Sequence, residues 1–215
     1  MRSVRWLRPG GELRQGTGAA VLAGLLSVLA GYAKADGIAD VATAPAMHYL
    51  GQPDYAIEID KSDRVLVVKH GTRVERRFQI ATGKGGLGDK RIRGDNKTPL
   101  GTYHITDFNE GSSFELFMRL NYPNLKDAFF GLKNRLITRG DFDRIVDALR
   151  ADQRPPQNTP LGGAIGIHGL GEETAERLKV HRVLDWTQGC IALDNRDVNE
   201  LRHYVKVGTK VVIRE

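Results

Sequence analysis

Short segments with alternating apolar residues begin at position 55, and they constrain the fold of this chain more than any other feature. Residues 55–60 alternate with a period of two, and residues 64–70 are rich in valine. Each segment is followed by a polar or glycine-containing turn signal. A period of two sends successive side chains to opposite faces of a strand. The two segments are therefore predicted to form a β-hairpin, with a third strand over residues 73–81.

Strand patterns recur along the rest of the chain, and helical patterns are fewer. Further strands are predicted over residues 101–107, near 115–120, and over 164–168, 190–193 and 210–213. Helices are predicted over residues 127–138, over 142–150, and from Asp194 or Asn195 to about Tyr204. The predicted fold class is mainly β with an α-helical insertion, and α+β overall. With 215 residues, 40% hydrophobic and 27% charged, the composition excludes long disorder, collagen and a multi-span membrane protein.

The helical insertion is expected at about residues 126–160. Within it, residues 142–150 place apolar side chains at i, i+3, i+4 and i+7, with Asp141 as the expected cap. A stretch with three prolines, residues 153–160, then breaks the helix and leads to a strand that ends at His168. Two interpretations remain open: a helical hairpin packed on the sheet, or a lid or wall over a cleft.

The first 35 residues have the pattern of a signal peptide. Four arginines form a basic region, residues 18–33 are apolar apart from Ser27, and Ala33-Lys34-Ala35 offers a small-x-small cleavage site. The apolar stretch is short for the hydrocarbon core of a bilayer, which favours cleavage over a retained N-terminal anchor. Residues 1–35 are therefore predicted to be a signal peptide, residues 36–53 a linker and residues 54–215 the folded domain.

The basic charge of the chain belongs mostly to this N-terminal segment. The whole sequence has 32 Lys and Arg against 26 Asp and Glu, a formal charge of +6. Residues 1–35 contain five of the basic and one of the acidic residues, so the remaining chain has 27 and 25, a net charge of +2. No nucleic-acid partner is therefore predicted, and membrane contact is expected only through the signal segment.

Residues 83–88 match the pattern G-x-G-x-x-G after a predicted strand, but no nucleotide site is expected there. Such a motif binds a pyrophosphate only when its last glycine opens a helix, and here Gly94 and Pro99 interrupt the following segment. The segment is predicted to be a loop beside a site. Its basic residues could attract an anionic substrate; they are Lys84, Lys90, Arg91, Arg93 and Lys97.

Cys190 is the single cysteine of the chain, which excludes an intramolecular disulfide and a multi-cysteine zinc module. A thiol is mostly protonated at neutral pH, so a nucleophilic cysteine needs a base or a positive charge beside it. His168, at the end of a predicted strand, can supply that base. The sequence Thr187-Gln188-Gly189 allows backbone N–H groups to converge on one point, as an oxyanion hole requires. From residue types alone, the alternatives are a buried cysteine and a structural histidine.

The run Thr187-Gln-Gly-Cys190, with His168-Gly169 upstream, resembles the [Ser/Thr]-x-Gly-Cys signature of the L,D-transpeptidase catalytic domain, the YkuD-like family of exported cell-wall enzymes. The segment from Gly94 to Tyr103 is similar to the family's G…T-P-x-G-x-[Tyr/Phe] stretch, and residues 208–213 are similar to its closing strand. Residues 120–124, which include Tyr122, resemble a Tyr-Pro-Asn stretch of one subgroup. The resemblance implies a β-sandwich or open barrel-like fold.

The resemblance implies a cysteine acyltransferase that acts on peptidoglycan stem peptides in the periplasm, without cofactor or metal. Cys190 would form a thioester with the third residue of the stem, and His168 would transfer the protons. The N–H groups of Gly189 and Cys190 would stabilise the oxyanion, and Thr187 would orient neighbouring groups. The residues expected to bind substrate are Gly169, Gln188, Tyr122, Asn195 and Arg93.

The sequence departs from the family pattern at two positions. Gln188 and Ala192 stand where many members have a second histidine and an Arg or Asn. The sequence Cys-Ile-Ala with Asn195 nearby is similar to a proteobacterial subgroup that includes an enzyme releasing a lipoprotein from peptidoglycan, so a wall-linked lipoprotein is a further candidate partner. Transpeptidation, hydrolysis and a catalytically silent wall-binding role remain alternatives. His181 is mainly expected to be structural, a catalytic part or a zinc site with His168 and Cys190 being less favoured.

Overall fold

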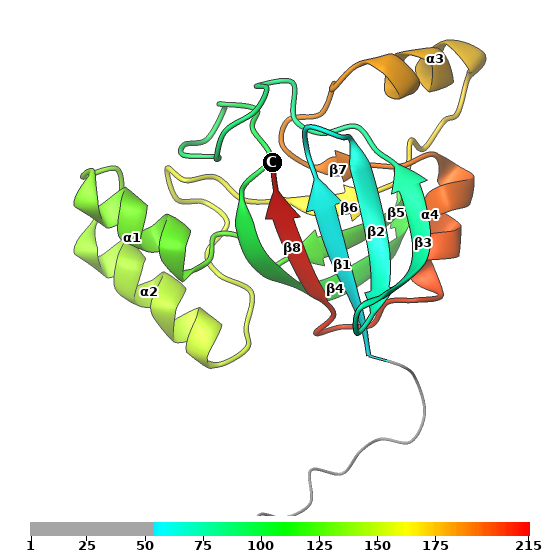
Figure 1. The fold of residues 1–215 in the computed structure, drawn as a ribbon. Helices are drawn as coiled ribbons and strands as arrows, with labels where there is room; N and C mark the ends of the chain where they lie inside the picture. The colour runs from blue at the N-terminus through cyan, green and yellow to red at the C-terminus, as the bar shows by residue number, and fades with distance from the viewer. Residues whose placement is uncertain (1–53) are drawn as a thin grey trace, which may run out of the picture. The chain divides into compact units, whose positions relative to one another are not determined.

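The computed structural model describes residues 54–215, so the predicted signal peptide and linker lie outside the described residues. Eight strands form one mixed sheet in the order β3-β2-β1-β8-β4-β5-β6-β7 (Figure 1). The strands are β1 (Tyr55–Asp60), β2 (Val65–His70), β3 (Arg73–Gln79), β4 (Gly101–Ser112), β5 (Glu115–Leu120), β6 (Gly166–His168), β7 (Ile191–Ala192) and β8 (Lys210–Arg214). The helices are α1 (Leu125–Lys133), α2 (Arg139–Arg150), α3 (Ala175–Val183) and α4 (Asn195–Arg202).

The predicted hairpin and third strand are confirmed. β1 pairs antiparallel with β2, and β2 pairs antiparallel with β3. The C-terminal strand β8 lies between β1 and β4, parallel to the first and antiparallel to the second. Strand β8 therefore joins the β1–β2 hairpin to β4 and the rest of the sheet.

The two ends of the sheet meet, which gives the fold its barrel-like character. Ala81, just after β3, forms an isolated bridge with Ala192 of β7, and the two residues exchange backbone hydrogen bonds of 3.0 and 2.8 Å. A second bridge joins Gly83 and Thr187. The main core fills the sheet interior and includes fully buried Ile57, Tyr103 and Met118. Burial of these apolar side chains is the main source of the folded domain's stability.

The helical insertion consists of α1 and α2, which pack on each other around a small core that contains Ile145 and Leu161. The predicted helix over residues 127–138 is shorter than expected and ends at Lys133. Asp141 is not the cap of α2: Thr138 takes the N-cap position, and Asp141 is its N3 partner in a capping box. Both Thr138 and Asp141 have side chains that can accept a hydrogen bond at a helix N-terminus, and the helix begins after the earlier of the two.

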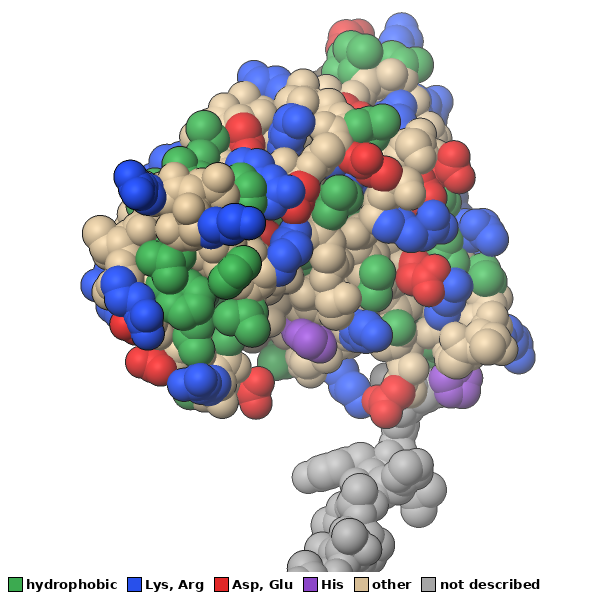
Figure 2. Space-filling view, turned by 60° about the vertical axis from the view of Figure 1, so that its left-hand side comes forward, with side chains coloured by type: hydrophobic (Ala, Val, Ile, Leu, Met, Phe, Trp, Pro, Cys, Tyr) green, Lys and Arg blue, Asp and Glu red, His purple; other side chains and the backbone are tan. Residues whose placement is uncertain are grey.

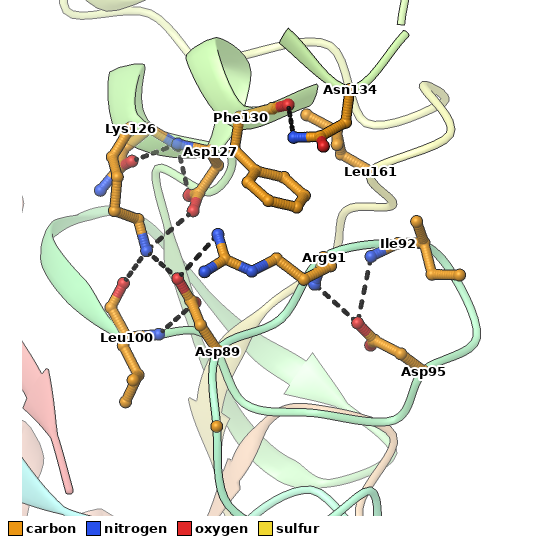
Figure 3. A network of polar contacts seen from close by, with 12 residues as sticks. Asp89, Arg91, Ile92, Asp95, Leu100, Lys126, Asp127, Phe130, Asn134 and Leu161 are labelled. Carbon is orange, nitrogen blue, oxygen red and sulfur yellow. Dashed lines mark hydrogen bonds and ion pairs between the residues drawn. The ribbon is translucent and has the colours of Figure 1, made fainter. Parts of the chain in front are cut away.

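A network of polar contacts joins α1 to the loop that follows β3 (Figure 3). Lys126 donates at 2.5 Å to the carboxylate of Asp89 and lies 3.2 Å from that of Asp127. Arg91 places its guanidinium 4.0 Å from the centre of the Phe130 ring. The insertion is thus attached to the body of the domain as a packed element, and its Gln157 also lines the cavity described below.

Hydrophobic side chains gather on one face of the insertion, with Lys and Arg side chains around them (Figure 2). A groove of about 330 Å³ lies there; it is lined by Leu125, Phe142, Val146, Leu149 and Arg150. In the part of the chain that the structure describes, no helix is long and apolar enough to cross a membrane.

Sequence reasoning missed helix α3. Four of its nine residues are charged, and of these nine, all of them described, His181 alone is buried. A helix with one buried side chain has no apolar stripe, so periodicity could not reveal it. Its N-cap Thr174, whose side chain accepts from the N–H of Arg177, was the available signal.

Candidate active site

A cavity of about 650 Å³ opens where β5, β6 and the segment before β7 meet. Five of the predicted site residues lie in its lining: Cys190, His168, Thr187, Gln188 and Arg93. The other lining residues are Lys90, Gly94, Asn96, Phe114, Phe117, Gln157, Gly162, Gly163, Ala164, Ile165 and Trp186.

The parallel pairing of β6 and β7 brings the histidine and the cysteine together. His168 is the register partner of Ala192, and Ile167 that of Ile191. Side chains two apart on a strand share a face, so Cys190, immediately before β7, faces the same side of the sheet as His168. The thiol and the imidazole therefore lie on one face, at adjacent strands, although 22 positions separate them in the sequence.

His168 is held in a defined orientation. Its Nδ1 lies 2.6 Å from the carbonyl oxygen of Gly169, and this contact requires a proton on Nδ1. In the neutral ring, Nε2 is then the free acceptor. The faces of the ring contact Phe114 (4.5 Å between centroids) and Phe117 (5.9 Å, stacked). Burial lowers the pKa of His168, against the opposing effect of the Gly169 carbonyl, so the ring is a neutral base at pH 7.

Cys190 is half-buried, and its thiol donates to the carbonyl oxygen of Ala164 at 3.3 Å. Burial raises the pKa of the thiol to about 11, although a hydrogen bond from the backbone of Gly166 and the charges of Arg119 and Lys90 oppose the rise. The resting site therefore holds a thiol and a neutral imidazole instead of an ion pair. Attack by the sulfur requires that its proton moves to a base during the reaction.

Thr187 organises the turn that carries the cysteine. Its Oγ1 donates to the carbonyl oxygen of Cys190 at 2.7 Å and accepts from the N–H of Gly189 at 3.1 Å. Gly189 has φ +126, and a Cβ there would lie 2.7 Å from the backbone oxygen of Lys97. Only glycine fits this position. Because the N–H of Gly189 is bonded to Thr187, the structure shows this glycine as a turn-forming residue, and its oxyanion role stays a prediction.

Three of the five residues predicted to bind substrate, Gly169, Tyr122 and Asn195, lie outside the cavity lining and have structural contacts. Tyr122 is fully buried, and its hydroxyl donates to the carbonyl oxygen of Leu161 at 2.9 Å. Asn195 is the first residue of α4; its Oδ1 accepts from the N–H groups of Leu170 and Gly171 at 2.8 and 3.1 Å. Asn195 thus fixes the backbone that follows the histidine.

Gly169, Gln188 and Arg93 have different positions. A Cβ on Gly169 would lie 2.8 Å from Oδ1 of Asn195, so glycine permits the close approach, and its carbonyl orients His168 as predicted. Gln188 is exposed at the cavity. Arg93 also lines the cavity, and its Nη2 donates to the carbonyl oxygen of Thr159 at 3.1 Å. Of the three, Gln188 and Arg93 are the ones placed to meet a ligand in the cavity.

The aromatic walls and the loop opposite the thiol were not predicted. Phe114, Phe117 and Trp186 line the cavity around His168. Trp186 directly precedes Thr187 in the sequence, and that adjacency was the available signal. Gln157, in the proline-rich segment, accepts from the N–H of Ala164 at 2.7 Å and thereby fixes the loop that faces the thiol. Nothing in the local sequence indicates that contact.

Lys90 is a cation of the cavity wall, and it is bonded to the protein: its Nζ lies 2.7 Å from Oδ1 of Asp95 and 2.9 Å from the carbonyl oxygen of Ile92. Within residues 54–215, no group of three or more His, Cys, Asp or Glu side chains is arranged to hold a metal ion.

The closed mixed sheet, with its helical additions, defines the L,D-transpeptidase fold. Residues 54–213 match the YkuD family, the L,D-transpeptidase catalytic domain, and the chain belongs to this family. No curated protein matches the chain in sequence.

Several solved structures are similar to this chain. The helical cell shape determining protein Pgp2 from Campylobacter jejuni is 25% identical with a TM-score of 0.50, over 77% of this chain and 49% of that chain. The structure of its K307A mutant is 25% identical with a TM-score of 0.51, over 78% of this chain and 49% of that chain. An L,D-transpeptidase from Xylanimonas cellulosilytica is 17% identical with a TM-score of 0.42, over 77% of this chain and 62% of that chain. The chain thus spans about half the length of the Pgp2 chains.

Proposed function

We propose that this protein is an exported, periplasmic cysteine acyltransferase that acts on peptidoglycan stem peptides. The observation that carries the proposal is the cavity shared by Cys190 and His168 in a domain of the L,D-transpeptidase family. A neutral imidazole beside a protonated thiol is the arrangement that general-base activation of a nucleophile needs.

In the first half-reaction, Sγ of Cys190 attacks the carbonyl carbon of the third stem residue while Nε2 of His168 takes the thiol proton. The bond from that carbon to the terminal D-amino acid breaks, and His168 returns the proton to the leaving amine. A thioester on Cys190 remains. The N–H of Cys190 is our candidate donor to the oxyanion of the tetrahedral intermediate.

In the second half-reaction, an acceptor attacks the thioester carbon and loses a proton to His168. The carbon–sulfur bond breaks, and the proton returns to the thiolate. An amine acceptor gives a crosslink or a protein attachment, whereas water gives a shortened or released stem. Transpeptidation is the leading function, and hydrolysis by the same residues, including release of a wall-linked lipoprotein, is the alternative.

A role in cell shape follows from the same proposal. Pgp2, the neighbour at 25% identity, is described as a helical cell shape determining protein. An enzyme that trims or joins stem peptides changes how the wall is crosslinked, so loss of the protein is expected to change cell shape.

Purified muropeptides incubated with the protein and read by mass spectrometry test the proposal. Crosslinked dimers indicate a transpeptidase, shortened or released stems indicate a hydrolase, and unchanged material contradicts both. Cys190→Ser and His168→Gln are expected to abolish turnover. His104→Gln is the matched control, because His104 is exposed on β4, outside the cavity lining. If Cys190→Ser left the product pattern unaltered, the nucleophile assignment would be wrong.

A carbapenem offers an independent test of the acyl-enzyme. Family membership leads us to expect that Cys190 opens the β-lactam ring and retains the acyl group as a thioester, seen as a mass increase on the intact protein. Because the chain has one cysteine, peptide mapping of the adduct is unambiguous. Absence of an adduct on the native protein, with an adduct on a known family member in parallel, argues against the acyl-enzyme.

A further inference from the structure

Trp186 lies between two histidines, and only one of them lines the cavity. On one side, its ring meets the ring of His168 edge-on, with centroids 6.2 Å apart and an interplanar angle of 72°. On the other side, its indole Nε1–H donates to Nδ1 of His181 at 3.4 Å. His181 is on α3, away from the cavity lining, and is 3% exposed.

Helix α3 is fixed to the body of the domain independently of the cavity. Arg64, after β1, donates to the carbonyl oxygens of His181 (2.7 Å), Arg182 (3.0 Å) and Leu184 (3.1 Å) at the C-terminal end of the helix. These are the carbonyls that a helix leaves without intrahelical partners. The imidazole of His181 is therefore presented from a fixed backbone.

The protonation state of His181 agrees with its role as an acceptor. Burial is the main cause that lowers the pKa of His181, and the charges of Arg64 and Arg182 act in the same direction. Asp194 and Glu173 act in the opposite direction. A neutral ring with its proton on Nε2 has Nδ1 free to accept from the indole.

Trp186 adds an edge contact to the contacts that already orient His168. The Gly169 carbonyl fixes one ring nitrogen, and Phe114 and Phe117 contact the ring faces. Trp186 supplies the contact from the side. An indole whose N–H is bonded keeps its own ring plane, whereas an indole without that bond can turn.

We propose that His181 is a positioning residue for the catalytic pair: it holds Trp186 by the indole N–H, and Trp186 keeps the imidazole of His168 in the orientation that serves Cys190. The proposal rests on the proposed function, because it gives His168 the role of base. A structural role for His181, limited to anchoring α3, is the competing interpretation that the experiment must exclude.

The rate at which iodoacetamide alkylates Cys190 tests the proposal without a peptidoglycan substrate. The full chain has one cysteine, so the rate reports a single thiol. His168→Ala sets the rate without the base. His181→Leu removes the acceptor and is expected to lower the rate at neutral pH on the order of tenfold, as misplacement of a catalytic group does. His181→Asn offers Oδ1 near the position of Nδ1 and is expected to restore most of the rate.

A double-mutant cycle tests whether His181 acts through Trp186. Trp186→Phe keeps an aromatic ring but removes the N–H, so it is expected to be as slow as His181→Leu. The double variant is expected to be no slower than either single variant, because both remove the same contact. Rate losses that multiply in the double variant would overturn the proposal, as would His181→Asn being as slow as His181→Leu.

Tryptophan fluorescence supplies a signature that a purely structural role would not produce. The chain has two tryptophans, Trp6 and Trp186, so the full chain with Trp6→Phe reports Trp186 alone. In this background His181→Leu is expected to change the emission spectrum and His181→Asn to leave it nearly unchanged, with circular dichroism confirming that both fold. An unchanged spectrum for a folded His181→Leu would overturn the proposal.

The outcomes separate this inference from the proposed function. If His168→Ala alkylates as fast as the native protein, the Cys190–His168 pair is not functional and the proposed function fails with it. If His168→Ala is slow but His181→Leu is not, only the inference fails. Muropeptide turnover plays no part in either result.

Discussion

The thiol of Cys190 donates to the carbonyl oxygen of Ala164 across the cavity, 3.3 Å from sulfur to oxygen. Ala164 has φ +54, a left-handed conformation that is uncommon for alanine. Gln157 maintains it by accepting from the N–H of Ala164, while its Nε2 donates to the carbonyl oxygens of Tyr122 (2.9 Å) and Pro155 (2.8 Å). Cys190 is thus held as a protonated thiol against the carbonyl of Ala164, in the loop that Gln157 fixes.

The thiol of Cys190 should lose its proton only at high pH. Because burial raises the pKa of Cys190 to about 11, the thiolate absorbance of the free protein, taken as the difference from Cys190→Ser, is expected to have its midpoint near that pH. The neutral thiol is favoured in the folded state, so this group contributes stability at neutral pH that is lost as the pH rises through the folded pKa. A midpoint near or below neutrality would instead indicate a preformed thiolate–imidazolium pair.

Replacement of Gly189 by alanine should disrupt the turn that carries Cys190. The new Cβ would lie 2.7 Å from the backbone oxygen of Lys97, at φ +126, and we expect a loss of at least about 3 kcal/mol in the free energy of unfolding together with loss of activity. Gly71→Ala is the matched control: its φ is +60 and nothing lies within 4 Å of the new Cβ. That variant should lose about 1 to 2 kcal/mol. Equal losses in urea unfolding would contradict the steric argument.

Thr187 offers a conservative pair of substitutions. Thr187→Val keeps the shape but removes the hydroxyl that bonds both the Gly189 N–H and the Cys190 carbonyl. The Gly189 N–H then loses this acceptor, and the Cys190 carbonyl keeps only the longer contact from Oγ1 of Thr98, at 3.5 Å. We expect a loss of about 1 to 3 kcal/mol in stability and a larger loss in the rate of Cys190 acylation. Thr187→Ser keeps the hydroxyl and should recover most of both. Thermal unfolding and carbapenem labelling, measured side by side, check this; a fully active Thr187→Val would show that the hydroxyl is dispensable.

The strands could be predicted because they leave local signals, and so could the placement of Cys190 and His168 at one cavity. Alternating apolar residues show where β1 to β3 run, and the Thr187-Gln-Gly-Cys190 run resembles a known signature. The position of β6 was predicted two residues too early, since Ala164 with φ +54 cannot continue a strand. Backbone conformation of that kind is imposed by a distant partner, here Gln157, and has no mark in the local sequence.

Side-chain roles were harder to predict than the elements that carry them. Tyr122 was expected at the substrate, yet its hydroxyl bonds Leu161 in the interior. A tyrosine in a stretch that resembles a family motif can pack in the core or bind substrate. The direction of its side chain distinguishes the two roles, and the local sequence does not reveal that direction. The contact of Trp186 with His181 joins residues five apart, through a helix that periodicity does not detect.

Lys126 compensates two acidic groups between the insertion and the loop after β3 (Figure 3). Its Nζ lies 2.5 Å from Asp89 and 3.2 Å from Asp127, whose side chains are 9% and 2% exposed. Burial raises the pKa of Asp127, and the charge of Lys126 is the largest cause that opposes the rise. Removal of the lysine therefore leaves a buried carboxylate without its main counter-charge.

Lys126→Met is accordingly expected to destabilise the domain at neutral pH and to do so less in acid. Loss of one partner of a buried pair costs about 3 to 5 kcal/mol, and since Lys126 is 43% exposed we expect about 1 to 2 kcal/mol. As the pH falls through the raised pKa of Asp127, that carboxyl takes up a proton and the difference from the native protein should shrink. Lys133→Met, in the last turn of the same helix, is the matched control. Urea unfolding between acid and neutral pH measures both variants, and a difference independent of pH would show that the lysine acts by packing its methylenes and not by its charge.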